Sequence, residues 1–493
     1  MGMAKSINEL FEHVPMWLMV NGEPGMRITH LTHESRTVIP GSLFFALPGR
    51  HTNGVMYALN AIGKGAVAVV TEVELPDKIP QIVVKSVRAV MSLVAKAFYD
   101  NACDDLKIIG ITGTNGKTTT LHMLSHVLRS NNLSVATIGT LGAYIGTEKL
   151  YYQLTTPDPI ELHSLFHQMR SRSIKFVIME ATAHAIYLEK LEGVTFELGI
   201  FTNISQDHLD FFPNYETYAM TKVNWLGKLK NKIVNIDDRY GKLVGGDCIK
   251  YGLETENADI AAVRPNLMAT HSFFSVADGK KIWNGWRCPV PGRFNLYNAL
   301  ATISASRFLG VGSLAIKKAL KTLPPVPGRF NIIDVGGLTV VIDFAHTPDS
   351  LEKIIETCRE MIQGEGKIYT VFGCGGDRDK SKREKMGSIS AVLSDFTIVT
   401  SDNPRTENPQ LIMLQIEAGI KICNSNYKLI ECRRSAIFHA LEHAKKNDIV
   451  IIAGKGAEEY QEINGKKEPF CDREVVESYK SAQTRTRGSA CKR

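Results

Sequence analysis

The residues with the clearest chemical potential form a glycine-rich segment, residues 113–120, with the sequence Gly-Thr-Asn-Gly-Lys-Thr-Thr-Thr. It lies between a strand-like apolar run and a stretch of helical periodicity, and such a loop directs backbone N–H groups and a helix N-terminus at a phosphate. Lys117 would neutralise phosphate charge, and the hydroxyl of Thr118 would ligate magnesium. Ile111 stands where a standard phosphate loop has its first glycine. The alternative is therefore a glycine-rich turn that binds no nucleotide.

Three more residues are of types that hold metals or anions. Glu180 directly follows the apolar run 176–179, His208 lies in a polar segment, and Lys222 stands fourteen residues after His208. Magnesium prefers oxygen ligands and phosphates, so a carboxylate at a strand end is a candidate ligand beside a phosphate loop. Taken singly, each also has a structural explanation, as a strand-end glutamate, a loop histidine and a surface lysine.

The elements that must position these residues alternate between strands and helices. Apolar runs at 106–111, 176–179, 198–201 and 232–235 are separated by helical stretches, which is typical of an α/β fold with a largely parallel, doubly wound sheet. Earlier runs at 41–47 and 66–70 indicate a small α/β domain. Four later runs, at 339–343, 368–372, 396–400 and 448–453, each lead into a polar or glycine-rich loop.

A proline-rich stretch at 324–328 resists both helix and sheet and marks a domain boundary. We therefore predict domains at 1–107, 108–327 and 328–479. Residues 480–493 form a basic tail that we expect to be disordered. Ligands of open α/β sheets bind outside the carboxyl ends of the strands, so the loops at those ends are where chemistry is expected.

Composition limits the class of protein and its compartment. The 493 residues are 44% hydrophobic and 22% charged, with a net charge of +7 whose densest cationic run is the C-terminal tail. Scattered charge of this kind predicts neither a nucleic acid nor a membrane partner. The nine cysteines, an odd number without a C-x-x-C pair, indicate reduced thiols. No apolar run approaches the roughly 18 residues of a membrane span. We expect a soluble, cytoplasmic protein.

The form Gly-Thr-Asn-Gly-Lys-Thr resembles the phosphate loop of the Mur ligases and their folylpolyglutamate synthetase relatives, and further segments resemble motifs of the MurE branch in the same order. These segments are 34–36, 40–49, 155–157, 206–210, 291–298, 343–348, 373–379 and 401–405. The resemblance implies a three-domain, monomeric ligase with a central P-loop-type ATPase domain and a C-terminal Rossmann-like domain. It also implies that ATP, with Mg²⁺, activates a UDP-N-acetylmuramoyl dipeptide as an acyl phosphate, which meso-diaminopimelate attacks during peptidoglycan synthesis.

The same resemblance assigns site residues by motif. The catalytic set comprises Lys117, Glu180, His208 and Lys222, and Lys222 is expected to be carbamylated and to ligate metal together with Thr118, Glu180 and His208. The ATP set comprises Gly113, Thr114, Asn115, Gly116, Lys117, Thr118, Thr119, Asn298, Arg329 and Asp343. The UDP-dipeptide set comprises Ser35, Arg50, His51, Thr52, Thr155, Thr156, Thr182 and Lys190. The diaminopimelate set comprises Arg378, Asp402, Asn403, Pro404, Arg405, Gly454 and Glu458.

Arg405 and Glu458 are expected to determine which amino acid the enzyme uses. Diaminopimelate has a second carboxylate that Arg405 can bind with two hydrogen bonds, and Glu458 can accept from the distal ammonium. The sequence departs from the family pattern at Ala183, Leu188, Lys190 and Ala457. Two alternatives stay open: the same ligation with L-lysine, and a UDP-dipeptide-binding homologue with weakened catalysis.

Overall fold

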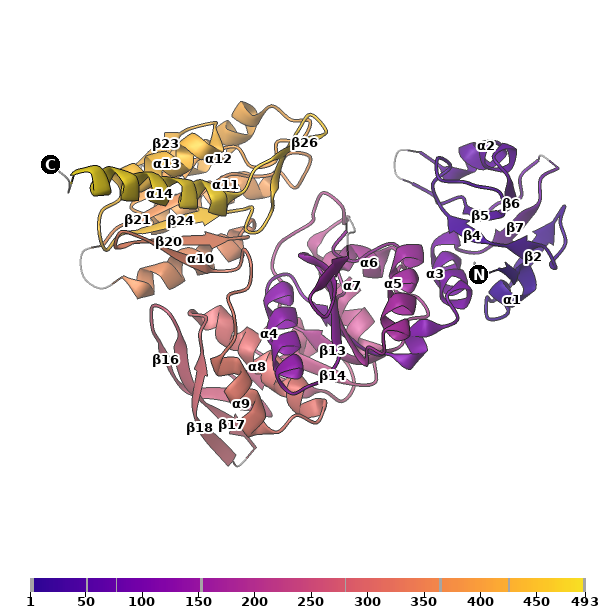
Figure 1. Ribbon diagram of the computed structural model, residues 1–493, viewed down its shortest axis with the longest axis horizontal. Helices are drawn as coiled ribbons and strands as arrows, with labels where there is room; N and C mark the ends of the chain where they lie inside the picture. The colour runs from indigo at the N-terminus through magenta and orange to yellow at the C-terminus, as the bar shows by residue number, and fades with distance from the viewer. Residues whose placement is uncertain are drawn as a thin grey trace. The chain divides into compact units, whose positions relative to one another are not determined.

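The computed structural model describes residues 4–49, 52–76, 78–150, 154–279, 281–362, 366–423 and 426–490, with side chains described up to residue 482 (Figure 1). The chain forms two compact units. The first comprises Met1–Thr112, Asn131–Ile200 and Trp225–Lys232, and the second comprises Gly113–Ser130, Phe201–Asn224 and Ile233–Arg493. None of the described helices has the length and apolar character needed to cross a membrane.

The first unit begins with a five-stranded sheet in the order β2-β7-β6-β5-β4. Only the edge strand β2 runs antiparallel to its neighbour. Helix α1 starts at a capping box formed by Ser6 and Glu9, and the apolar face of α3 packs on the sheet. The elements are α1 (Ile7–Phe11), β2 (Trp17–Val20), β4 (His30–Thr32), β5 (Ser42–Phe45), α2 (Ala58–Gly63), β6 (Ala66–Thr71), β7 (Gln81–Val84) and α3 (Val87–Phe98).

A second sheet of the first unit follows the order β11-β10-β9-β12-β8-β13. Strands β9, β12 and β8 are parallel, and their apolar side chains are buried. Continuous apolar runs are expected where both faces of a parallel sheet are covered. The elements are β8 (Lys107–Thr112), β9 (Val135–Gly139), β10 (Gly142–Ile145), β11 (Glu148–Leu150), α5 (Pro159–Ser171), β12 (Phe176–Glu180), α6 (Ala183–Tyr187) and β13 (Phe196–Phe201).

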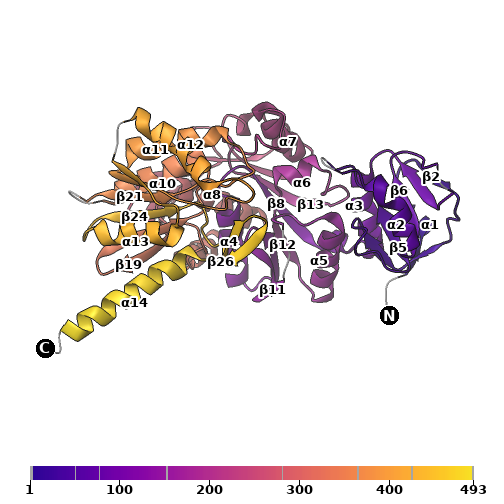
Figure 2. The same cartoon turned by 90° about the horizontal axis from the view of Figure 1, so that it is seen from above.

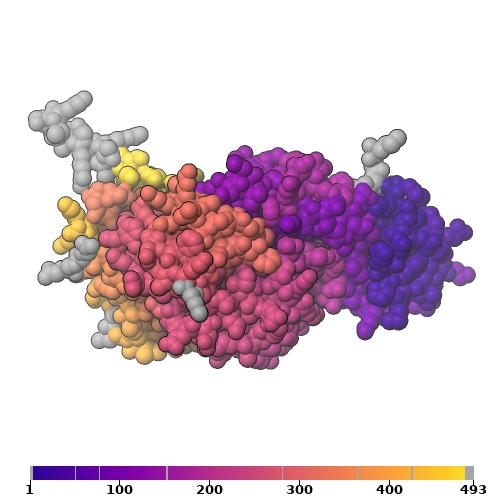
Figure 3. All heavy atoms as spheres, turned by 90° about the horizontal axis from the view of Figure 1, so that it is seen from below, coloured from indigo at the N-terminus to yellow at the C-terminus, as the bar shows by residue number. Residues whose placement is uncertain are grey.

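The second unit contains the strand series β14-β15-β16-β17-β18, in which β16 to β18 form an antiparallel meander. Helices α4 and α8 pack on each other, and α9 covers β18. The elements are α4 (Lys117–Ser130), α7 (Tyr215–Gly227), β14 (Lys232–Asn235), β15 (Ile249–Gly252), β16 (Ile260–Leu267), β17 (Ser272–Asp278), β18 (Lys281–Cys288), α8 (Arg293–Phe308) and α9 (Ser313–Lys321). In the space-filling view the atoms of β16 to β18 and their neighbours are closely packed (Figure 3), and Trp286 and Tyr251 are almost wholly buried.

The last part of the second unit is a six-stranded sheet in the order β19-β20-β24-β21-β22-β23, parallel except at β19. Helices α13 and α14 lie side by side and pack on the core of this sheet (Figure 2). The elements are β19 (Asn331–Val335), β20 (Leu338–Asp343), α10 (Pro348–Met361), β21 (Ile368–Phe372), α11 (Ser381–Leu393), β22 (Phe396–Val399), α12 (Pro409–Ile422), β23 (Tyr427–Leu429), α13 (Arg433–His443), β24 (Ile449–Ala453), β25 (Tyr460–Ile463), β26 (Lys466–Pro469) and α14 (Asp472–Ala490).

The predicted fold class, α/β with largely parallel sheets, is confirmed. The four late apolar runs coincide with β20, β21, β22 and β24 to within one residue at either end. Helix α14 continues to Ala490, into the segment from residue 480 that we expected to be disordered. The predicted domain limits at 107 and 327 stay predictions.

Candidate active site

The glycine-rich loop has a backbone that only glycine adopts without strain. Gly113 and Gly116 have φ of +140° and +86°, and a Cβ on either would overlap Thr202 or Asn298 respectively. The backbone carbonyl of Asn203 accepts a hydrogen bond from the N–H of Thr114 at 2.7 Å. The side-chain oxygen of Asn203 accepts from the N–H of Asn115 at 3.0 Å. The loop is therefore held in shape without a ligand.

Lys117 and the first turn of α4 complete the loop. The Nζ of Lys117 donates to the carbonyls of Gly113 and Thr114 at 2.9 and 2.8 Å. These are contacts that a phosphate oxygen would replace, because an ammonium ion pairs more strongly with an anion than with a neutral carbonyl. Thr118 is 4% exposed, and Arg329 donates to its hydroxyl at 3.0 Å.

Asn298 and Asp343 belong to the same unit as this loop. Asn298 accepts from the hydroxyl of Thr120 at 3.3 Å and donates to Asn295 at 3.1 Å. Asp343 accepts from the N–H of Phe330 at 2.7 Å, and its burial raises the pKa of the carboxyl. Thr118, Asn298 and Arg329 are thus brought to one place, while Asp343 lies at the end of β20, beside the backbone of the residue after Arg329.

Lys222 is a buried lysine, although its sequence context is that of a surface residue. It lies on α7 with only 1% of its surface exposed, hydrogen-bonds the Tyr218 hydroxyl, and places Nζ 3.4 Å from the hydroxyl of Thr114. Burial, and then the charge of Lys117, hold the pKa of Lys222 well below its usual value. A lysine whose pKa is lowered is more readily neutral, and a neutral amine is a nucleophile.

Asp207 is a site residue that the sequence reasoning did not single out. Its carboxylate lies 3.3 Å from Nε2 of His208 and 3.9 Å from Nε2 of His346. Burial acts to raise the pKa of Asp207, but the two imidazoles and nearby lysines outweigh it and hold that pKa far below its usual range. In the sequence, the one feature that could have identified Asp207 was its position next to His208. In the structure, His208 has a φ of +57°.

In the first unit, Glu180 ends β12 and is 1% exposed. It accepts from the N–H and the hydroxyl of Thr140 at 2.8 and 3.2 Å. The hydroxyl of Thr156 donates to the Glu180 carbonyl at 2.7 Å and lies 3.0 Å from that of Thr182, which caps α6. The hydroxyl oxygens of Thr155 and Thr140 lie 3.4 Å apart. Glu180 and three of the predicted dipeptide ligands are therefore gathered at one set of strand ends.

The remaining predicted dipeptide ligands are less closely connected. The ammonium of Lys190 pairs with Asp158 at 2.7 Å and is largely buried. Ser35 is half-buried, with its carbonyl accepting from Lys64 at 2.7 Å, and Thr52 is exposed. Arg50 and His51 lie outside the described residues.

The loops after β22 and β24 meet around Asn403. Its side-chain oxygen accepts from Lys455 at 3.0 Å and from the N–H of Glu462 at 2.9 Å, and its amide donates to Glu458 at 2.9 Å. Lys455 has no exposed surface and also pairs with Glu458 at 2.9 Å. Gly454 has a φ of +114°, and a Cβ there would lie 2.6 Å from Asp402. Contacts between the two loops thus hold five of their residues in place: Asp402, Asn403, Gly454, Lys455 and Glu458.

Arg405 follows Pro404 and has a φ of +52°. Its Nη1 donates to the carbonyl of Gly376 at 2.6 Å, and its Nε lies 3.2 Å from a carboxylate oxygen of Glu462. Arg378 was predicted to bind diaminopimelate together with Arg405. Its Nη1 lies 3.7 Å from a carboxylate oxygen of Asp210, and its side chain is about half-exposed.

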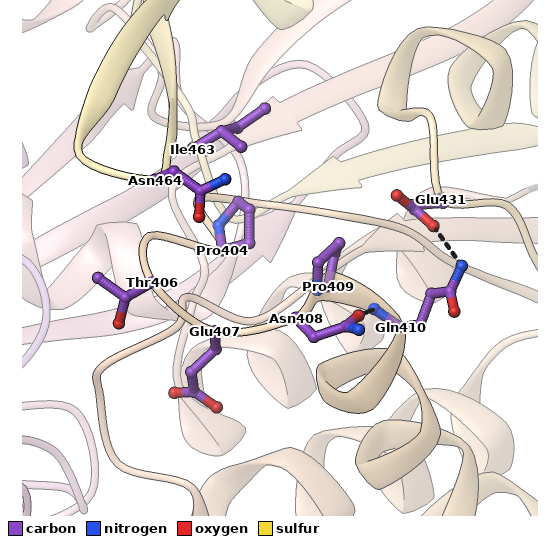
Figure 4. Close-up of a pocket in the computed structure, with 9 residues that line it drawn as sticks. All are labelled: Pro404, Thr406, Glu407, Asn408, Pro409, Gln410, Glu431, Ile463 and Asn464. Carbon is purple, nitrogen blue, oxygen red and sulfur yellow. Dashed lines mark hydrogen bonds between the residues drawn. The ribbon is translucent and has the colours of Figure 1, made fainter.

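A shallow pocket of about 450 Å³ adjoins the loop that carries Arg405 (Figure 4). Pro404, Thr406 and the start of α12 line it on one side, and Ile463 and Asn464 on the other. Glu407 and Glu431 make it acidic.

The donor groups fit magnesium better than a metal held by protein alone. No three His, Cys, Asp or Glu side chains of the described residues are grouped as a metal site. Magnesium in nucleotide enzymes takes few protein ligands and several from phosphate and water, so a hydroxyl such as Thr118 at the phosphate loop meets that requirement.

Three family models match successive parts of the chain. They are the Mur ligase family, catalytic domain, over residues 27–99; the Mur ligase middle domain over 111–306; and the Mur ligase, glutamate ligase domain, over 328–456. The chain is 40% identical over 471 residues to UDP-N-acetylmuramoyl-L-alanyl-D-glutamate--2,6-diaminopimelate ligase 1 of Clostridium acetobutylicum, covering 94% of this chain and 96% of that one. It is also 40% identical to a ligase of the same description from Clostridium botulinum, covering 91% and 94%.

Comparison with solved structures also finds a ligase of this family. A structure titled as a UDP-N-acetylmuramoyl-L-alanyl-D-glutamate--2,6-diaminopimelate ligase superposes with a TM-score of 0.69 at 30% identity, covering 98% of this chain and all of that one. The MurF ligase of Thermotoga maritima in complex with ADP superposes with a TM-score of 0.58 at 19% identity, covering 86% and 93%. The second likeness concerns the fold alone.

Proposed function

This chain belongs to the Mur ligase family, and from that premise we propose that it uses ATP to join meso-diaminopimelate to UDP-N-acetylmuramoyl-L-alanyl-D-glutamate, forming a peptide bond in peptidoglycan synthesis. The observation that carries the proposal is the 40% identity, over 94% of the chain, to a ligase of that description. The glycine-rich loop with Lys117 and the guanidinium of Arg405 on the loop after β22 agree with it.

The reaction needs an activated carboxylate. The D-glutamyl carboxylate attacks the γ-phosphorus of ATP, ADP leaves, and an acyl phosphate results. The amine of diaminopimelate then attacks the acyl carbon, and inorganic phosphate leaves with the bonding electrons while the amine loses its proton. Lys117, Thr118 and the loop N–H groups hold the phosphates in line, and such positioning supplies most of the catalysis in phosphoryl transfer. Asn298, Arg329 and Asp343 complete the proposed nucleotide site.

Magnesium, when bound, neutralises the charge that crowds the transferred phosphoryl oxygens. We assign Thr118, Glu180, His208 and the carbamate of Lys222 as its protein ligands. The burial of Lys222 supports that modification, because a neutral amine attacks carbon dioxide and releases one proton to give an anionic carbamate. Asp207 orients His208 through the 3.3 Å contact.

The amino-acid pocket is assigned to Arg378, Asp402, Asn403, Pro404, Arg405, Gly454 and Glu458. Arg405 accounts for diaminopimelate over lysine, because lysine lacks the second carboxylate that the remaining N–H donors of the guanidinium would bind. The dipeptide is assigned to Ser35, Arg50, His51, Thr52, Thr155, Thr156, Thr182 and Lys190. A reaction that consumes ATP, and the free thiols of all eight described cysteines, fit a cytoplasmic enzyme, and we infer a monomer.

Loss of catalysis in a binding homologue does not fit the site. Burial of Lys222 costs stability, since its charged form must be desolvated, and groups perturbed in this way cluster at functional sites. The experiment that tests the proposal is phosphate release from ATP with UDP-N-acetylmuramoyl dipeptide and a panel of amino acids. We expect release with meso-diaminopimelate and much slower release with L-lysine. Equal rates with both would refute the proposed substrate, and no release with any amino acid would refute the ligase activity.

A further inference from the structure

Three helices, α4, α5 and α13, each carry two histidines four residues apart. Side chains at this spacing are neighbours on one face of a helix, so two imidazoles can bind the same metal ion. Whether a given pair can do so depends on how its ring nitrogens are already used and on its access to solvent. The structure distinguishes the three pairs on both counts.

The pairs on α4 and α5 are poorly placed to bind an ion. On α4, Nε2 of His126 lies 3.0 Å from the carbonyl of Ala319, which occupies the outer nitrogen of that ring. The other histidine of this pair, His122, has its pKa lowered to about 4 by burial and then by nearby arginines, which would also repel a cation. On α5, His163 is only 1% exposed.

The imidazoles of His439 and His443 lie against each other at the end of α13. Their ring centroids are 3.9 Å apart, and the ring planes are inclined by 49°. His443 is exposed, and His439 is half-buried with its ring 6.4 Å from that of Phe396. Two nitrogens that each bind one ion at about 2.1 Å lie roughly 3 Å from each other. Rotation of the two side chains is therefore enough to bring both rings onto one ion.

A backbone contact fixes the tautomer of His443. Its Nδ1 donates to the carbonyl of His439 at 2.8 Å, so in the neutral ring Nε2 carries a lone pair. Metal-binding histidines commonly donate their second N–H to a carbonyl in this way, which also orients the ring. Among the residues that the structure describes, Nε2 of His443 and both ring nitrogens of His439 have no hydrogen-bond partner.

The charges around this pair leave room for a cation. Burial, and then the adjacent His443, lower the pKa of His439, which favours its neutral form; Lys428 acts in the same direction and Glu442 opposes it. Glu442 completes the pattern H-x-x-E-H, a spacing found in zinc-binding helices. A catalytic zinc site needs three protein ligands, and the described residues offer no such group of three. The pair can therefore bind an ion without forming a hydrolytic centre.

We propose that His439 and His443 bind one divalent transition-metal ion, such as Ni²⁺ or Zn²⁺, through one nitrogen of each ring, with water in the remaining positions. Imidazole suits these ions, whereas Mg²⁺ prefers oxygen ligands. The site is thus chemically distinct from the magnesium site of the proposed ligation, and neither depends on the other.

The test is calorimetric titration of Ni²⁺ into the full chain without a polyhistidine tag, at about pH 7.5, where an ordinary imidazole is mostly neutral. Excess Mg²⁺ is present to occupy sites with oxygen ligands. The variants are His439→Gln and His443→Gln, with His167→Gln as the matched control, because it removes one histidine of the α5 pair. Cys432→Ser controls for the exposed thiol that precedes α13.

We expect the wild type to bind an ion that both α13 variants bind at least about tenfold more weakly, since even losing the outer partner of a ligand costs that much. The two controls should bind as the wild type does. Ni²⁺ should also raise the melting temperature of the wild type but not of His443→Gln, because an ion that binds only the folded state stabilises it. Equal melting temperatures without Ni²⁺ would show that the variants fold.

Wild-type affinity for Ni²⁺ in both α13 variants overturns the inference. Loss of binding in Cys432→Ser would assign the ion to the thiol, and loss in His208→Gln would assign it to the group around Asp207. Either result also overturns the inference, and all of them leave the proposed function standing.

Discussion

Arg433 donates two hydrogen bonds of 2.8 Å to the carboxylate of Asp472, and neither side chain has any exposed surface. A third bond joins Arg433 to the carbonyl of Ala453 at 2.9 Å, and its Nη1 lies 3.9 Å from Asp402. One arginine thus connects the starts of α13 and α14 with the two loops of the amino-acid region. Burial lowers the pKa of Arg433, but Asp472 more than offsets that effect.

Replacing Asp472 by Asn should therefore destabilise the protein strongly. Breaking a buried ion pair by removing one partner costs about 3 to 5 kcal/mol, because the other charge is left uncompensated. Denaturant unfolding measures this, and Arg434→Met on the exposed side of α13 is the control, expected to change stability by less than about 0.5 kcal/mol. A loss in Asp472→Asn no larger than in the control would show that the pair contributes nothing.

Lys117→Ala should abolish ligation. In the proposed function the Lys117 ammonium meets the transferred phosphoryl group, and removing one such group typically lowers kcat by about a hundredfold or more. Phosphate release at saturating substrates gives the rate. Turnover near the wild-type level would mean that the loop does not bind the reacting phosphates.

Lys222→Ala should also lose activity, and a short carboxylate such as formate or acetate should restore part of it. The added anion would occupy the space of the carbamate and ligate magnesium in its place. Rates across a titration of the carboxylate provide the measurement, with chloride as the ionic-strength control. Full activity in the unrescued variant would exclude an essential modification.

Arg405→Ala should remove most of the preference for diaminopimelate over L-lysine. A charge-assisted bidentate contact is worth roughly 2 to 4 kcal/mol when desolvated, or about thirtyfold to several hundredfold in the specificity ratio. Competition at equal concentrations, with the products separated by mass, measures the ratio directly. A variant that retains the wild-type ratio would place selectivity elsewhere.

Glu407 should make the stability of the second unit sensitive to acid. Hydrogen bonds from the buried Arg383, at 2.9 Å to each oxygen, lower the pKa of Glu407 from 4.5 to about 2. The folded state therefore holds its proton less tightly than the unfolded chain, so this contribution is complete above about pH 4.5 and is lost as the pH falls towards 2. Melting temperatures between pH 6 and 3 should fall more steeply in the wild type than in Glu407→Gln, and parallel curves would contradict this.

Strands such as β8, β12, β20 and β24 were predictable from sequence because each is a largely continuous apolar run. The parallel strands β15 and β23 were not, because polar residues interrupt them. The β25–β26 hairpin was not, since β26 (Lys466–Pro469) is wholly exposed and has no apolar alternation. The same limit applies to the ion pair of Arg405 with Glu462, which joins residues 57 positions apart in the chain. Asp207 was likewise missed, because its burial and its approach to His208 and His346 depend on the fold.

Position 454 tolerates few substitutions of its glycine. Its positive φ and the 2.6 Å approach of Asp402 exclude every larger side chain without movement of the loop. Bacteria commonly escape an inhibitor by exchanging a small residue of the target for a bulkier one that blocks the compound. A compound designed to lie against Gly454 would close that route to resistance, because the mutation that expels the compound would also displace Asp402, one of the residues that we propose bind the amino acid.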